Sequence, residues 1–313
     1  MNLASRAIHS FPHFSRQFLM KPVCRIQYAS DLHLEHYDKM PFSTILRPNA
    51  RILALSGDIG RPDKPLYSSF LNWCHDKWDH IFLIAGNHEF YNTKLFYKWN
   101  QSAPHTYEER LAQCRAICSQ WPNVHFLEKD EVYLEEYNTA FLGTTLWTHI
   151  PMNKFGEALH MVNDYNYIAK KDENGKPTRF SPSDSAKLHV ESVGWLNARL
   201  HECEEKQKHV VILTHHVPSQ SLIPEIYKNH PSNLCFVTDL DEMIAPPVRA
   251  WICGHSHHQK EVLFQRDDPP TSEKSTLLAI NAYGYNFKEQ INYNAERVLS
   301  FSCEPPQEPI LLA

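Results

Sequence analysis

Glycine is scarce in this chain, at 9 of 313 residues. A glycine at a strand end is therefore more informative than usual, because glycine alone tolerates every backbone conformation. Long apolar runs are also missing. No stretch approaches the roughly 20 residues that span a membrane, so we expect no membrane partner. Basic runs are missing too, and the formal net charge is −5, which argues against a general electrostatic grip on nucleic acid.

The eight cysteines are scattered, and none forms a C-x-x-C pair. Cys114 and Cys118 have helical i, i+4 spacing, and most of the others lie in apolar surroundings. We expect reduced thiols in a cytoplasmic protein. Residues 1–20 contain no acidic residue, two arginines and three serines, which is faintly similar to a mitochondrial transit peptide. Pro12 interrupts any amphipathic helix there, so a flexible extension is preferred and mitochondrial targeting is the alternative.

Short apolar runs rich in β-branched residues, each followed by turn signals, predict buried strands. They lie at residues 23–29, 52–55, 81–85, 210–214 and 250–253. Amphipathic patterns between them predict helices at residues 66–78, 107–121 and 183–203. Strands that alternate with helices are typical of a layered α/β domain.

The remaining segments add β structure. Residues 124–142 resemble strands joined by a turn at residues 136–138, which predicts a hairpin or meander. Residues 147–180 are irregular and could form a lid or an excursion from the core. No linker divides the chain, so we predict one domain over residues 21–302, between the N-terminal extension and a tail at residues 303–313. Further strands are expected around Leu263 and at residues 277–280 and 298–301.

Histidine is abundant, at 20 residues, and metal-binding residue types directly follow five predicted strands. Because an α/β sheet presents its ligand-binding loops at the carboxyl ends of its strands, these residues should converge. A single D-x-H or a single strand-end histidine would be a weak signal. Five clusters at five strand ends are a strong one, since packing gives no reason to gather polar side chains there. The clusters are Asp31-Leu32-His33, Gly57-Asp58, Gly86-Asn87-His88-Glu89, Thr214-His215-His216 and Gly254-His255-Ser256-His257.

The residue types suit a pair of divalent cations. A carboxylate such as that of Asp58 offers two oxygens and can bridge two ions. Imidazoles and the amide oxygen of Asn87 supply further ligands. Mixed nitrogen and oxygen ligation without thiolate favours Mn, Fe, Zn or Co over a structural zinc or a calcium cage. Two such ions about 3.5–4 Å apart clamp a phosphoryl group and generate a hydroxide nucleophile.

These motifs resemble the calcineurin-like metallophosphoesterase superfamily. The match covers residues 23–260, about three quarters of the chain. The resemblance implies a four-layered αββα sandwich, with two mixed β-sheets flanked by helices. It also implies two divalent metal ions. One would be held by Asp31, His33 and His257, the other by Asn87, His215 and His255, with Asp58 bridging them. His88 matches the histidine of the family that approaches the leaving-group oxygen, as a general acid or as a stabiliser of the transition state.

The chain departs from the family at the second motif. Protein Ser/Thr phosphatases continue that motif as G-D-x-x-D-R-G, whereas residues 57–63 read G-D-I-G-R-P-D. The departure weakens a protein-phosphatase assignment and leaves His88 without its usual carboxylate partner, for which Asp63 is a candidate.

The sequence is more similar to a diverse microbial-type branch of the superfamily. Residues 281–285, N-A-Y-G-Y, resemble the N-P-x-G-Y segment of that branch, with Ala282 in place of proline. Residues such as a loop arginine or a turn asparagine also have ordinary structural interpretations. The candidate substrate-binding residues are Arg61, His149, Asp164, Asn281 and Tyr285.

The leading hypothesis is a dinuclear, metal-dependent phosphoesterase that hydrolyses a phosphomonoester or phosphodiester by metal-activated hydroxide. A small-molecule or nucleotide ester is preferred as substrate, and the oligomeric state is left open. One alternative is a catalytically inactive interaction scaffold with the same fold, against which the complete ligand set argues. Another is a nuclease of the same superfamily, which a basic groove beside the metals would mark.

Overall fold

The computed structural model describes residues 22–93, 103–265, 275–285, 287–290 and 292–303. The predicted N-terminal extension at residues 1–20 lies outside this range. So does the predicted tail, apart from Cys303.

The first sheet has five strands in the order β13-β1-β2-β3-β4. Strands β1 to β4 are parallel, whereas β13 pairs with β1 in the antiparallel sense. Both faces of β2 are buried, which explains its continuous apolar sequence. The strands span Val23–Ala29 (β1), Ile52–Ser56 (β2), His80–Ile84 (β3), Val124–Phe126 (β4) and Val298–Ser302 (β13).

The second sheet has six strands in the order β11-β12-β10-β9-β6-β5. Its four central strands are parallel, and each edge strand is antiparallel to its neighbour. Both sheets are therefore mixed. The strands span Asp130–Leu134 (β5), Thr139–Thr144 (β6), His209–Thr214 (β9), Val248–Cys253 (β10), Lys260–Phe264 (β11) and Thr276–Ile280 (β12).

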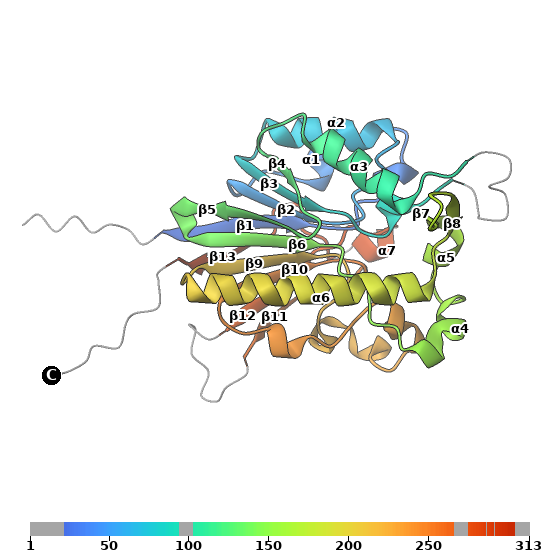
Figure 1. The fold of residues 1–313 in the computed structure, drawn as a ribbon. Coiled ribbons are helices and arrows are strands. Elements are labelled where there is room, and N and C mark those ends of the chain that lie inside the picture. The colour runs from blue at the N-terminus through green and yellow to red at the C-terminus, as the bar shows by residue number, and fades with distance from the viewer. Residues whose placement is uncertain (1–21, 94–102, 266–274, 286, 291, 304–313) are drawn as a thin grey trace, which may run out of the picture.

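Helices cover the two outer faces (Figure 1). Helices α1 (Phe42–Ile45), α2 (Pro65–His75) and α3 (Tyr107–Cys118) lie over the first sheet, and α6 (Pro182–Glu205) runs along the second. Capping boxes fix the starts of the two longest helices, through Thr106 with Glu109 in α3 and Ser181 with Asp184 in α6. The predicted αββα sandwich is confirmed.

The two sheets face each other across an apolar core. Phe82 of β3 stacks on Phe141 of β6, with ring centroids 4.1 Å apart. A further apolar cluster lies between the first sheet and its helices, and another lies between the second sheet and α6. Close packing on both faces fixes the positions of the strands, and it thereby fixes the loops at their carboxyl ends.

Residues 124–142 differ from the single hairpin or meander that the sequence indicated. Strand β4 belongs to the first sheet, while β5 and β6 form a hairpin in the second. The chain crosses between sheets near Lys129, which has a positive φ of 50°. Asn138 ends the β5–β6 connection with φ 46°, a conformation that asparagine tolerates well. The turn was predicted correctly, and the change of sheet was missed.

The irregular stretch at residues 147–180 contains short elements and one small hairpin. It lies at the same end of the sandwich as α7 (Phe287–Gln290) (Figure 1). Its elements are Met152–Lys154 (η5), Phe155–Ala158 (α4), Asp164–Tyr167 (α5), Ala169–Lys171 (β7) and Pro177–Arg179 (β8).

Four 3-10 turns connect β9 to β10, at Gln220–Leu222 (η6), Glu225–Tyr227 (η7), Pro231–Cys235 (η8) and Asp241–Met243 (η9). Over the described part of the chain, no helix is both long enough and apolar enough to cross a bilayer.

Candidate metal centre

The seven residues proposed as metal ligands come together at the carboxyl ends of β1, β2, β3, β9 and β10. One group is formed by Asp31, His33 and His257. His33 Nε2 lies 3.0 Å from His257 Nε2, which in turn lies 3.4 Å from Asp31 Oδ1. Three donor atoms therefore face a common point.

A second group adjoins the first through Asp58. Asp58 Oδ2 lies 3.3 Å from His215 Nε2 and 3.9 Å from His33 Nε2. His215 Nε2 is also 3.1 Å from Asn87 Oδ1, and His255 completes the group with a donor atom within 4.8 Å of those of Asp58 and His215. Asp58 thus stands between the two groups, where a bridging carboxylate would stand.

The backbone at the site is strained. Five of the seven residues have positive φ, between 47° and 67°, which is uncommon for residues other than glycine. Each such residue costs on the order of 1–2 kcal/mol, and strain of this kind gathers at functional sites. The five are Asp31, His33, Asp58, His255 and His257.

Two glycines allow the loops to approach the carboxylates. A Cβ on Gly86 would collide with Asp58 Oδ1, and a Cβ on Gly254 would lie 2.7 Å from Asp31 Oδ2. Any side chain at either position would push a carboxylate out of place. In a chain with so few glycines, these two are explained by the site.

Glu89 ties two of the loops together. Its buried carboxylate accepts hydrogen bonds from the backbone N–H groups of Gly86 (2.7 Å), Ile59 (2.8 Å) and Asp58 (3.0 Å). Burial and the nearby charge of Asp58 raise the pKa of Glu89 to about 8. Its oxygens are engaged by backbone groups, so Glu89 supports the site rather than serving as a ligand.

The electrostatics of the site favour positive charge. Burial alone would lower the pKa of His215, but Asp58 outweighs it and raises that pKa to about 10. Asp31 likewise raises the pKa of His257 to about 9 against the effect of burial. The same carboxylates would attract a divalent cation in place of these protons. The donor set, made of carboxylate, amide and imidazole groups, therefore fits divalent metal ions.

Hydrogen bonds on the far side of the rings orient two of the histidines. His215 Nδ1 donates to the backbone oxygen of Ser56 (2.9 Å), and His257 Nδ1 donates to Glu289 Oε2 (2.8 Å). Each bond leaves Nε2 as the free donor atom toward the metal position, which is the usual arrangement around histidine ligands.

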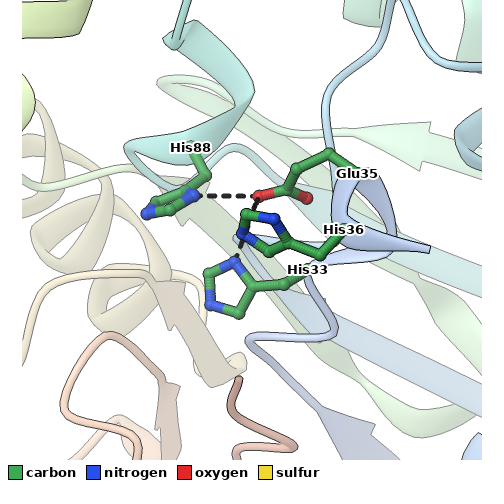
Figure 2. Close-up of side chains that lie close together, drawn as sticks. All are labelled: His33, Glu35, His36 and His88. Atoms are coloured by element: carbon green, nitrogen blue, oxygen red, sulfur yellow. Dashed lines mark hydrogen bonds and ion pairs between the residues drawn. The ribbon is translucent and has the colours of Figure 1, made fainter. Parts of the chain in front are cut away.

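His88 has a carboxylate partner that the sequence did not indicate (Figure 2). His88 begins the turn η2 (His88–Phe90), and Glu35 lies in the turn η1 (Leu34–His36). His88 Nδ1 donates to Glu35 Oε1 (2.9 Å), while the His88 backbone N–H donates to Asp58 Oδ1 (2.8 Å).

Glu35 stays ionised in this environment. Burial raises its pKa, but the hydrogen bonds from His33 and His88 outweigh burial and bring the pKa down to about 2. Asp63, the partner that the sequence suggested, is engaged elsewhere. Its carboxylate lies 2.7 Å from Arg61 Nη2 and 3.1 Å from Arg110 Nη2. The candidate Asp63 is therefore not the partner of His88: Glu35 takes that place, and Asp63 pairs with Arg61 and Arg110.

Two of the five candidate substrate-binding residues lie at the site. The Tyr285 hydroxyl lies 2.8 Å from His88 Nε2, and its half-exposed ring stacks on that of His33 with centroids 4.1 Å apart. Asp164 is buried, and its Oδ1 accepts a hydrogen bond from Asn87 Nδ2 (2.7 Å). Asp164 thus turns the amide so that Asn87 Oδ1 faces the metal position.

The side chains of the other three candidates engage other groups. Arg61 is buried and pairs with Asp63. His149 is exposed, and its ring faces that of His189. Asn281 Nδ2 donates to the backbone oxygens of Tyr28 and Asn294 (both 2.9 Å), which makes it a structural link between β12 and the loop before β13.

Replacing Glu289 should have a measurable effect on metal binding. Its Oε2 accepts hydrogen bonds from His257 Nδ1 (2.8 Å) and from the backbone N–H of Tyr285 (2.7 Å). We expect Glu289→Gln to weaken binding of one metal ion by about 10–100-fold, because His257 loses an anionic partner. Titration calorimetry with Mn²⁺ or Zn²⁺ measures this. Glu296→Gln, at a half-exposed surface position, serves as the control, and equal affinities in the two variants would contradict the role of Glu289.

Comparison with known proteins places the chain in a family. The model of the calcineurin-like phosphoesterase family matches residues 25–259, and the chain belongs to that family. Membership supports a phosphoesterase in general terms, in a family that usually binds divalent metal ions. The chain is also 30% identical over 285 residues to the uncharacterized protein L509 of Acanthamoeba polyphaga mimivirus, a match covering 86% of this chain and 94% of that protein.

Among solved structures, the chain is similar to TT1561 of Thermus thermophilus, with a TM-score of 0.44 and 12% identity over 90% of this chain and 100% of that one. It is also similar to a dimetal phosphatase from Danio rerio, with a TM-score of 0.37 and 12% identity over 82% of this chain and 87% of that one.

Proposed function

We propose that this chain hydrolyses a phosphate monoester or diester at a dinuclear metal centre. The observation that carries the proposal is the position of Asp58, whose Oδ2 lies between a group containing His33 and a group containing His215. When bound by these residues, two divalent cations would neutralise charge on the phosphoryl oxygens and supply an activated water as the nucleophile.

His88 is proposed to serve the leaving group. Its Nδ1 is held by Glu35, so its Nε2 points to the Tyr285 hydroxyl at the mouth of the site. Burial lowers the pKa of His88, but the charges of Asp58 and Glu35 outweigh it and raise that pKa. The raised pKa favours the protonated ring, which can share a proton with the departing alcohol oxygen.

The side chains around the opening of the site favour a compact substrate. Tyr285 covers His33 and approaches His88, and its ring stays partly exposed beside the partly exposed ring of His36. Aromatic faces of this kind suit a small organic or nucleotide ester. The net charge of −5 gives no general attraction to a polyanion. A small-molecule or nucleotide ester is therefore the proposed substrate class.

The proposal is tested with metal-reconstituted protein. We expect about two ions per chain and turnover of p-nitrophenyl phosphate, bis-p-nitrophenyl phosphate or both. The ratio of the two rates separates monoester from diester preference. A protein that takes up two ions and turns over neither compound, nor any nucleotide ester, would contradict hydrolysis. A protein that binds no metal would be the scaffold instead.

A further inference from the structure

A second set of metal-binding side chains adjoins the dinuclear centre (Figure 2). His33, Glu35, His36 and His88 each offer a donor atom, and these four atoms lie within 4.8 Å of one another. His33 belongs to the dinuclear centre through Nε2, so the donors left for another ion are Glu35, His36 and His88. They come from two adjacent turns, η1 and η2.

The spacing of these donors suits a zinc-type ion. Ligands bound about 2.0–2.1 Å from a tetrahedral Zn²⁺ lie roughly 3.3 Å apart. Glu35 Oε1 lies 2.9 Å from His88 Nδ1 and 3.6 Å from His36 Nε2, so the two distances fall on either side of that value. Small side-chain movements would bring both to the required geometry.

Two observations indicate unused binding capacity here. Glu35 Oε2 is buried and has no hydrogen-bond partner among the residues that the structure covers. A buried carboxylate oxygen without a partner is costly, and a cation held by both oxygens of Glu35 would relieve that cost. The His36 side chain is 55% exposed and is not one of the ligands proposed for the dinuclear centre. An ion can therefore reach it from solvent.

We propose that Glu35, His36 and His88 form a third cation site, of zinc type and weaker than the dinuclear centre. The ion would bind the Nδ1 lone pair of His88, and the proton on that nitrogen would pass to solvent. Three protein ligands and one open position make an incomplete zinc site, and an exposed His36 must be ordered when the ion binds. For both reasons, the third site should bind its ion more weakly than the dinuclear centre binds its metals.

Occupancy of this site would inhibit the enzyme. An imidazole that binds a cation at Nδ1 cannot also carry a second ring proton, so His88 could no longer act as an imidazolium acid. This consequence rests on the proposed function, whereas binding of the third ion does not. Excess zinc is therefore expected to inhibit turnover by occupying residues that border the metal pair.

The test compares wild type with His36→Gln over a range of free Zn²⁺, counting bound ions by equilibrium dialysis and elemental analysis. Wild type should bind two ions tightly and a third at higher free zinc. His36→Gln should keep the tight pair and bind the third ion at least about tenfold more weakly. His201→Gln removes a histidine that is also exposed but lies on α6, and it should behave as wild type.

Turnover in the same samples gives the second readout. The zinc concentration that halves activity should rise in His36→Gln by the same factor as the third dissociation constant. A third ion bound equally well by wild type and His36→Gln, or no third ion in wild type, would overturn the proposal. Because the ion count needs no turnover, failure of the third site is distinguishable from failure of the proposed hydrolysis.

Discussion

Asp58→Asn should abolish turnover and leave the fold intact. The Asp58 Oδ1 atom accepts a hydrogen bond from the His88 backbone N–H (2.8 Å), which an asparagine oxygen can also accept. The Oδ2 atom faces His215 and His33, and an amide NH₂ group there offers no lone pair to either ion. We expect kcat/KM to fall about 10³-fold or more, since the group proposed to hold both ions is lost.

The measurements for Asp58→Asn are turnover, bound metal and melting temperature. Asp38→Asn makes the same change of charge at an exposed position seven residues from Asp31, and it should leave all three unchanged. Wild-type turnover in Asp58→Asn would exclude Asp58 as the bridging ligand. A large fall in melting temperature would instead show that the buried carboxylate is needed for folding.

Glu35→Gln should reduce kcat by about 10²–10⁴-fold, the usual contribution of a positioned acid or base. Both proteins are compared at a metal concentration that fills the metal pair but leaves the proposed third site empty. Glutamine keeps the shape of the side chain but removes the charge that raises the pKa of His88 and that fixes its Nδ1–H. The metal pair must be filled in both proteins because Glu35 also contacts His33 Nδ1 at 3.3 Å.

A double mutant tests whether Glu35 acts through His88 or disturbs the site in another way. If Glu35 acts through His88, then Glu35→Gln combined with His88→Asn should cost no more than His88→Asn alone. Effects that multiply would show that Glu35 and His88 act independently, and they would remove the proposed dyad.

The sequence predicted the strands, and the convergence of the polar clusters at their ends, well, because both follow from local patterns. Strand β1 was predicted with its observed bounds, and the other predicted strands differ by one or two residues at an end. Apolar runs define buried strands, and polar residues directly after them must lie at the sheet edge. Asp31, Asp58 and Asn87 were identified on this basis.

Partners of the ligands were harder to predict, because their positions depend on packing. Glu35 follows His33 by two residues, and its contact with His88 depends on the turn η1, which begins after the positive φ of His33. Glu289 lies in a four-residue helix with no motif of its own, and it reaches His257 through the fold. The sequence signal that could have found Glu35 is its position two residues after the proposed ligand His33. No comparable sequence signal marks Glu289.

The segment after residue 259 is needed to complete both sheets. The family match ends there, yet β12 and β13 pair with β10 and β1 from beyond that point, and Glu289 reaches back to His257. A truncation at the matched boundary would expose one long side of each sheet as an open hydrogen-bonding edge. Such a fragment would tend to aggregate, so an inactive product of that truncation says nothing about the chemistry of the intact chain.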